Sequence, residues 1–192
     1  TDTGVHALGQ VVHFHYQGRL PAATFVVGGN ALLPRDVRIL AAEEAALEFH
    51  SRYSARRRRY RYHIGTRPCA VGRQYSWYIA HALQVEEMDL AVQQLLGEHD
   101  FVSFCQAGSG LEHHRCFVQA ATWQRQGEQI VLDITANRFV HNMVRIIVGT
   151  SIEVGRGRLV IADMQRILDA RDRTLAGPTV PAHGLFLVEV GY

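Results

Sequence analysis

A predicted hairpin between two predicted helices is the pattern that most restricts how this chain can fold. Residues 117–125 and 129–137 each have the composition of a strand, and Gly127 lies between them as a turn. The segments 86–96 and 139–154, on either side, carry apolar residues at helical spacing. Helices mixed with strands that are partly joined by hairpins indicate an α+β fold.

Shorter patterns predict the remaining elements. We expect a turn that feeds a strand over 8–14, a helical segment ending at 30–34, strands over 36–41, 53–64 and 185–190, and a helix over 160–170. Residues 65–72, which include Pro68, are typical of a turn or linker. The sequence therefore predicts two domains, 1–72 and 73–192.

Composition limits the classes of protein to consider. The chain has 192 residues, of which 47% are hydrophobic, enough for one large or two small domains with a real core. No apolar run approaches the roughly 20 residues that cross a bilayer, so no membrane association is expected. Cys69, Cys105 and Cys116 form no C-x-x-C pair, and the histidines fit no standard metal spacing. We expect a reducing, cytoplasmic setting and no metal.

Arginine is distributed unevenly. All 20 basic residues are arginine, and the stretch between Arg52 and Arg73 holds eight of them with no Asp or Glu. Such a block is typical of a surface that binds a polyanion. If residues 53–64 are extended, alternation places Arg58, Tyr60 and Tyr62 on one face and Arg57, Arg59 and Arg61 on the other. The arginines would then hold phosphates while Tyr60 meets a base.

The first seven residues, Thr-Asp-Thr-Gly-Val-His-Ala, suggest a catalytic group. Gly4 follows Asp2 by two positions, so Asp2 is expected on a tight turn at the edge of a strand. A carboxylate held there can act as a nucleophile or a base. Taken alone, the same pattern also fits an aspartate that only forms the turn. His6 is expected to fix the loop.

Five segments in the same order resemble the tRNA pseudouridine synthase A (TruA) family. They are the Thr-Asp-x-Gly-Val-His-Ala start with Gly9-Gln10-Val11, the Arg-x-Tyr-Arg-Tyr of 58–62, and the blocks at 97–104, 138–150 and 184–187. Thr3 stands where many members have Ala. The family's Gly-Arg pair before Thr1, with its first strand and helix, is not in this sequence, so we expect a chain that lacks this segment.

The resemblance implies an isomerase that converts uridine to pseudouridine at tRNA positions 38 to 40, in the anticodon stem-loop. It implies a homodimer, two RRM-like halves that form a basic cleft, and no cofactor. It also implies that Asp2 is the nucleophile, that Tyr60 lies in the active site, that Arg145 pairs with Asp2, and that Leu185 lines the uracil pocket.

The residues themselves agree with this chemistry. The isomerisation needs neither a redox change nor a group donor, and a stacked tyrosine can offset part of the loss when a base leaves its stack. In a helix over 139–154, His141 and Arg145 would be i, i+4, and Arg138 and Arg145 i, i+7, all on the polar side. Arg138 and His141 then join the candidates for RNA binding.

Other interpretations remain open at this level. Arg145 could be a solvated arginine on a helix, and Leu185 an ordinary core residue of a strand. The whole chain could be a non-catalytic RNA-binding module of the RRM type, or a histidine-rich metal hydrolase.

Overall fold

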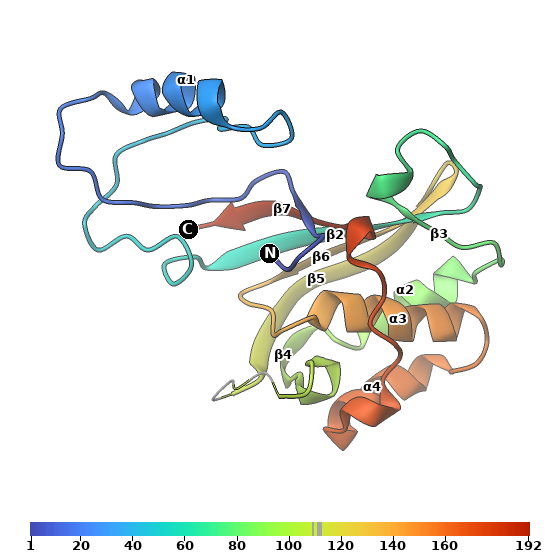
Figure 1. The fold of residues 1–192 in the computed structure, drawn as a ribbon. Coiled ribbons are helices and arrows are strands. Elements are labelled where there is room, and N and C mark those ends of the chain that lie inside the picture. Colours follow the sequence, from blue (N-terminus) through green and yellow to red (C-terminus); the bar gives the residue numbers. More distant parts are fainter. Residues whose placement is uncertain (109, 111–112) are drawn as a thin grey trace. The chain divides into compact units, whose positions relative to one another are not determined.

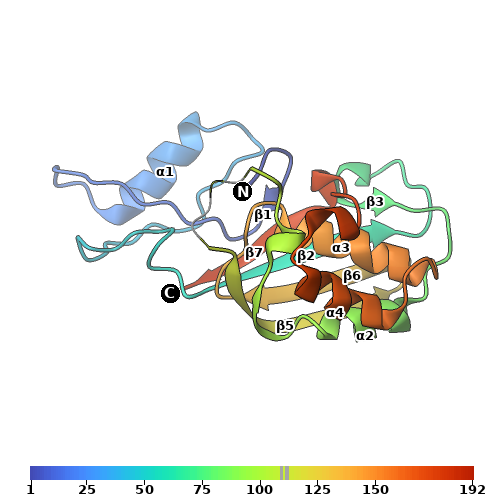
Figure 2. The same cartoon turned by 90° about the horizontal axis from the view of Figure 1, so that it is seen from below.

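This computed structural model describes residues 1–108, 110 and 113–192, and its central feature is a seven-stranded, mostly antiparallel sheet (Figure 1). The hydrogen-bonded order is β1 (His6–Ala7), β7 (Leu185–Gly191), β2 (Arg57–Gly65), β6 (Gln129–Ala136), β5 (Arg115–Gln126) and β4 (Gly97–Asp100). The short strand β3 (Trp77–Tyr78) runs parallel to the end of β2, as β1 does to β7. The segment rich in arginine and tyrosine is therefore a central strand. Figure 2 shows the strands side by side from β1 to β5.

Three helices cover one face of this sheet (Figure 1). They are α2 (Val85–Gln93), α3 (Met143–Gly155) and α4 (Ile161–Ala170). Almost every side chain of α3 is buried, which explains why its sequence is apolar nearly all round. Met88 of α2, Ile147 of α3 and Ile167 of α4 are fully buried in one core with Tyr62 and Leu132 of the strands. The α+β class is thus confirmed.

Most predicted elements are present with small shifts in their ends. The hairpin forms as β5 and β6, the closing strand is β7, and the predicted helix over 160–170 is α4. The predicted helix over 86–96 is α2, and the helical segment before Pro34 is α1 (Ala22–Leu32). These elements form where apolar periodicity and turn glycines agree with each other.

The predicted start of the helix at 139 is wrong. The helix begins at Met143, because Asn142 adopts a left-handed conformation, with a φ of 60°, that a right-handed helix cannot include. Arg138 and His141 therefore precede α3, and the argument that they share a helix face with Arg145 does not hold.

Two predicted strands are also absent from the described residues. Residues 36–41 are irregular, because both the N–H and the C=O of Ile39 bond to the side chain of Asn30, at 2.9 Å each, and have no neighbouring strand. Residues 8–14 also form no strand. The strand at this end of the chain is His6–Ala7, where β7 supplies a partner. A strand pattern without a partner in reach does not form a strand.

The chain packs as two compact units. Residues 1–10 and 55–192 form the larger one, which contains the sheet and helices α2, α3 and α4, and residues 11–54 form the smaller one. Within the smaller unit, Phe25 of α1 meets the rings of Phe14 and Tyr16 edge to face, with centroids 5.2 and 5.1 Å apart. The expected pair of domains that meet at 65–72 stays a prediction.

Candidate active site

Asp2 lies in a turn that leads directly into β1. The N–H of Val5 donates to the carbonyl oxygen of Asp2 at 3.1 Å, and Gly4 has a φ of 82°, which explains why glycine stands there. His6 then stacks on Phe186 of β7, with centroids 4.8 Å apart, and its Nε2 lies 3.0 Å from the carbonyl oxygen of Gln74. The predicted glycine turn at a strand edge is confirmed, with His6 fixing it.

Tyr60 lies on the central strand β2, within reach of the charge of Asp2. Its ring meets Phe139 edge to face at 5.1 Å. Burial raises the pKa of Tyr60, the negative charge of Asp2 raises it further, and the positive charge of Arg58 opposes the shift. The phenol of Tyr60 therefore stays protonated at neutral pH and can donate a hydrogen bond.

His141 is the ionisable group in contact with the Asp2 side chain. Its Nε2 lies 3.9 Å from Oδ1 of Asp2, and both side chains are almost half exposed. The carboxylate is thus open to solvent and to a substrate. His141 reaches Asp2 from the segment before α3, so the structure brings this candidate to the site by a route other than the helix face that was predicted.

Arg145, at the first turn of α3, is held by neutral oxygens. Its Nε donates to the carbonyl oxygen of Val180 at 2.7 Å, and Nη1 donates to Oδ1 of Asn142 at 2.8 Å. The adjacent carbonyl of Pro181 accepts a hydrogen bond from the hydroxyl of Tyr62 at 2.8 Å. Among the described residues, no ion pair joins Arg145 to Asp2. Their pairing therefore stays a prediction.

Asn142 is a site residue that the sequence reasoning missed. Its left-handed backbone turns the amide toward Arg145, and its Nδ2 donates to Oε1 of Gln106. A guanidinium can only donate, so Arg145 fixes which end of the amide faces it. The signal in the sequence was an Asn directly before the apolar helix, a residue type that tolerates positive φ.

The arginines of β2 alternate as predicted, but Arg57, Arg59 and Arg61 have acidic partners. Arg57 pairs with Glu189 of β7 at 2.7 Å. Arg59 and Arg61 both bond to Asp133 of β6, with shortest distances of 2.6 and 2.9 Å. Burial raises the pKa of Asp133, but hydrogen bonds and charge from the two arginines outweigh it, so the net shift is downward. The acids missing from this stretch of sequence are supplied by the neighbouring strands.

The sequence offers three further candidates, Arg58, Arg138 and Leu185, whose described contacts are with residues other than Asp2. Arg58 donates to the carbonyl oxygens of Ala55 and Asn137, at 2.8 and 2.6 Å. Nη1 of Arg138 lies 3.1 Å from a ring nitrogen of His113. Leu185 is buried, at 5% exposure, opposite Tyr62 in the sheet.

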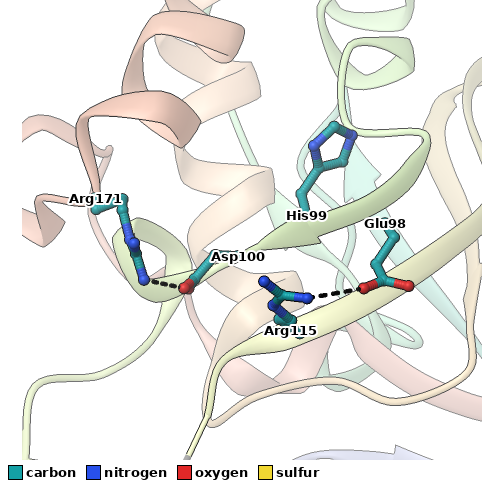
Figure 3. Close-up of a pocket in the computed structure, with 5 residues that line it drawn as sticks. All are labelled: Glu98, His99, Asp100, Arg115 and Arg171. Atoms are coloured by element: carbon teal, nitrogen blue, oxygen red, sulfur yellow. Dashed lines mark hydrogen bonds and ion pairs between the residues drawn. The ribbon is translucent and has the colours of Figure 1, made fainter.

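A polar cavity of about 310 Å³ lies at the β4 edge of the sheet, and none of the candidate site residues lines it (Figure 3). Arg115 pairs with Glu98 at 3.6 Å, and Arg171 bonds to Asp100. Each of the two arginines that line this cavity thus faces an acid of the same lining.

Two further features of the described residues concern a membrane-spanning helix and a metal site. No helix of the described residues has the length and apolar character needed to cross a membrane. Within the same residues, His, Cys, Asp and Glu side chains form no group of three or more that could hold a metal ion.

Known proteins resemble this chain over its whole length. Residues 91–192 match the family described as tRNA pseudouridine synthase. The tRNA pseudouridine synthase A of Moorella thermoacetica is 45% identical over 194 residues, which covers 100% of this chain and 79% of that protein. Those of Caldicellulosiruptor bescii and Bacillus subtilis are 43% and 39% identical, again over 100% of this chain, and over 80% and 78% of their own lengths.

Proposed function

The chain belongs to the tRNA pseudouridine synthase family, and from this premise we propose that Asp2 is the nucleophile for a uridine in the tRNA anticodon stem-loop. The observation that carries the proposal is an Asp2 carboxylate that is accessible to solvent, lies 3.9 Å from Nε2 of His141 and acts through its charge on the Tyr60 phenol. By family resemblance the target uridines are those at positions 38 to 40.

One carboxylate is enough for the central steps of this isomerisation. The bond between N1 of uracil and C1′ of the ribose breaks, the base rotates, and C5 bonds to C1′. The proton on C5 is lost and N1 gains one, so no electron donor, acceptor or cofactor takes part. Attack by Asp2 on C6 of the base and attack on C1′ of the sugar both fit this balance.

The neighbouring side chains have roles that follow from their chemistry. Tyr60 stacks on the base that leaves the helix, and its protonated hydroxyl can relay a proton. Arg145 retains donors on its outer guanidinium nitrogens, which can bind the Asp2 carboxylate when the substrate is present. Leu185 contributes to the apolar wall of the uracil pocket. The arginines of β2, with Arg138 and His141, contact the RNA.

We also propose the larger assembly that the resemblance implies. Two RRM-like halves, 1–72 and 73–192, would form a basic cleft, and two copies of the chain would bind one tRNA as a homodimer. No disulfide joins the cysteines among the described residues, and we propose a reducing compartment such as the cytoplasm. Light scattering with and without tRNA measures the dimer directly.

A tritium-release assay tests the function. A tRNA transcript that carries tritium at C5 of uridine releases it to water when C5 is joined to C1′. We expect release that is unaffected by EDTA. Binding without release would favour a non-catalytic RNA-binding module, and loss of activity in EDTA would favour metal chemistry.

Tyr60→Phe separates two roles of the tyrosine. Phenylalanine keeps the ring and loses the hydroxyl, so we expect tRNA affinity to persist while kcat falls by about 100-fold, the size typical of a lost acid or base. Single-turnover tritium release measures this change. A rate near that of the wild type would restrict Tyr60 to stacking and packing.

Asn142→Gly tests whether Asn142 orients Arg145. Glycine accepts the φ of 60° at this position, so the fold is kept while the amide is lost. We expect kcat to fall by about tenfold, the effect of one lost hydrogen bond of roughly 1.4 kcal/mol. Asn142→Asp, which retains an oxygen acceptor and tolerates the same backbone, is the matched variant. An unchanged kcat in Asn142→Gly would contradict the role.

A further inference from the structure

A second cavity, of about 250 Å³, lies where β3 meets the segment before β7. Its lining includes the basic side chains of Arg67, Arg73 and His183 together with Trp77 and Tyr78. Tyr78 is 45% exposed, so one aromatic ring is available to a ligand. Of the residues that the structure describes, no acidic one lines this cavity. It therefore combines positive charge with an aromatic surface, the two features that bind single-stranded nucleic acid.

The charge of this cavity is less neutralised than that of the cavity at β4. Arg67 pairs with Glu128, but both side chains are well exposed, at 72% and 64%, so the pair is weak. The Arg73 guanidinium has neither an ion pair nor a hydrogen bond to any described residue. In the β4 cavity, each arginine has an acid of the same lining within 4 Å, Glu98 for Arg115 and Asp100 for Arg171. Arg73 is the cation that is open to a new anion.

The cavity is connected to the turn that holds Asp2. Gln74 is next to Arg73 in the chain, and its carbonyl oxygen lies 3.0 Å from Nε2 of His6. Ala182, next to His183, would lie 3.3 Å from a Cβ at Gly4, so the chain passes close to the Asp2 turn there. The aromatic wall is connected to Tyr60, because Trp77 and Tyr78 pair with Ile64 and Gly65 on β2, the strand that carries it. The residues that line this cavity thus belong to segments that contact the Asp2 turn or pair with β2, the strand of Tyr60.

We propose that this cavity is an RNA subsite for a nucleotide next in chain to the isomerised uridine, with its phosphate on Arg73 and its base against Tyr78. The inference rests on the proposed function, since it takes the reacting uridine to lie at Asp2. A phosphate contact gives affinity without reading sequence. A base stacked on tyrosine adds affinity that every base can supply.

The salt dependence of tRNA binding tests the phosphate contact. Arg73→Gln removes one cation, so we expect the slope of log K against log salt to fall by about 0.7 to 0.9. We expect KM to rise and kcat to stay unchanged. Arg115→Gln, in the β4 cavity, is the matched control and should leave the slope as it is. An unchanged slope in Arg73→Gln overturns the assignment.

Aromatic substitutions test the base contact. We expect Tyr78→Ala to weaken tRNA binding by about tenfold and Tyr78→Phe to preserve it. Equal affinity of both variants and the wild type would overturn the stacking role. Tritium release distinguishes this failure from a failure of the proposed function. An enzyme that releases tritium, but whose Tyr78→Ala variant binds tRNA as tightly as the wild type, lacks this subsite, whereas a protein that never releases tritium lacks the activity itself.

The chain also carries its own reporter for the cavity. Cys69 lines it and is exposed, whereas Cys105 and Cys116 are buried, at 2% and 1% exposure. A maleimide should therefore label Cys69 first. We expect saturating tRNA to slow this labelling at least tenfold, with Cys69→Ala confirming the site. Labelling at the same rate with and without tRNA would overturn the proposal.

Discussion

Asp2→Asn is expected to abolish pseudouridine formation while tRNA binding persists. The amide has nearly the shape of the carboxylate but lacks its charge and its nucleophilic oxygen. The turn is kept by the backbone bond from Val5 to the carbonyl of Asp2, which the side chain does not form. We therefore expect a loss in kcat of about 10,000-fold or more, as when other enzymes lose a catalytic nucleophile, with little change in melting temperature.

Single-turnover tritium release and a binding titration with the same tRNA measure the two effects separately. Asp36→Asn, an exposed aspartate of the smaller unit, is the matched control and should retain full activity. Turnover by Asp2→Asn within tenfold of the wild type would remove Asp2 from the chemistry.

Gly149→Ala is expected to produce the largest loss of stability. A Cβ at this position of α3 would lie 1.9 Å from the carbonyl oxygen of Pro178, which is backbone and cannot move aside alone. Overpacking of this kind costs about 3 kcal/mol, which corresponds to a melting temperature lower by roughly 6 to 12 °C for a chain of this size. Activity should fall as well, because the displaced segment leads to Val180 and Pro181, which bond Arg145 and Tyr62.

Thermal unfolding followed by circular dichroism measures the effect. Gly28→Ala is the control, since Gly28 is also helical and has nothing within 4 Å of the added Cβ. Alanine has the higher helix propensity, so this variant should be neutral or slightly more stable. Equal melting of Gly149→Ala and the wild type would mean that α3 and the segment from Gly177 to Pro181 are not in close contact.

The elements that the sequence predicted well are those specified by their own residues. The hairpin around Gly127 and the helix α4 need only local periodicity and a turn. The start of α3 was missed because Asn142 changes the backbone direction at one residue, which apolar spacing does not record. The strand predicted over 36–41 does not form, because strand formation depends on a partner that lies elsewhere in the chain.

The candidate site divides in the same way. The turn at Asp2 follows from Gly4 alone, and the alternation along β2 follows from strand geometry. The partners of Arg59 and Arg61 could not be found in the same way, because Asp133 lies on β6 and reaches them through sheet register. Contacts between distant segments are properties of the fold, and residue spacing along the chain does not contain them.

The double contact of Asp133 with Arg59 and Arg61 has a consequence for selectivity. In the absence of RNA, one carboxylate already occupies two cations on the central strand. A polyanion of arbitrary shape must displace that carboxylate before it gains either arginine, so loose association with unrelated nucleic acids is disfavoured. An RNA whose backbone fits along β2 can engage both guanidiniums from their exposed side and leave Asp133 in place. On the proposed function, we therefore expect Asp133 to favour RNA whose backbone follows β2 over polyanions attracted by charge alone.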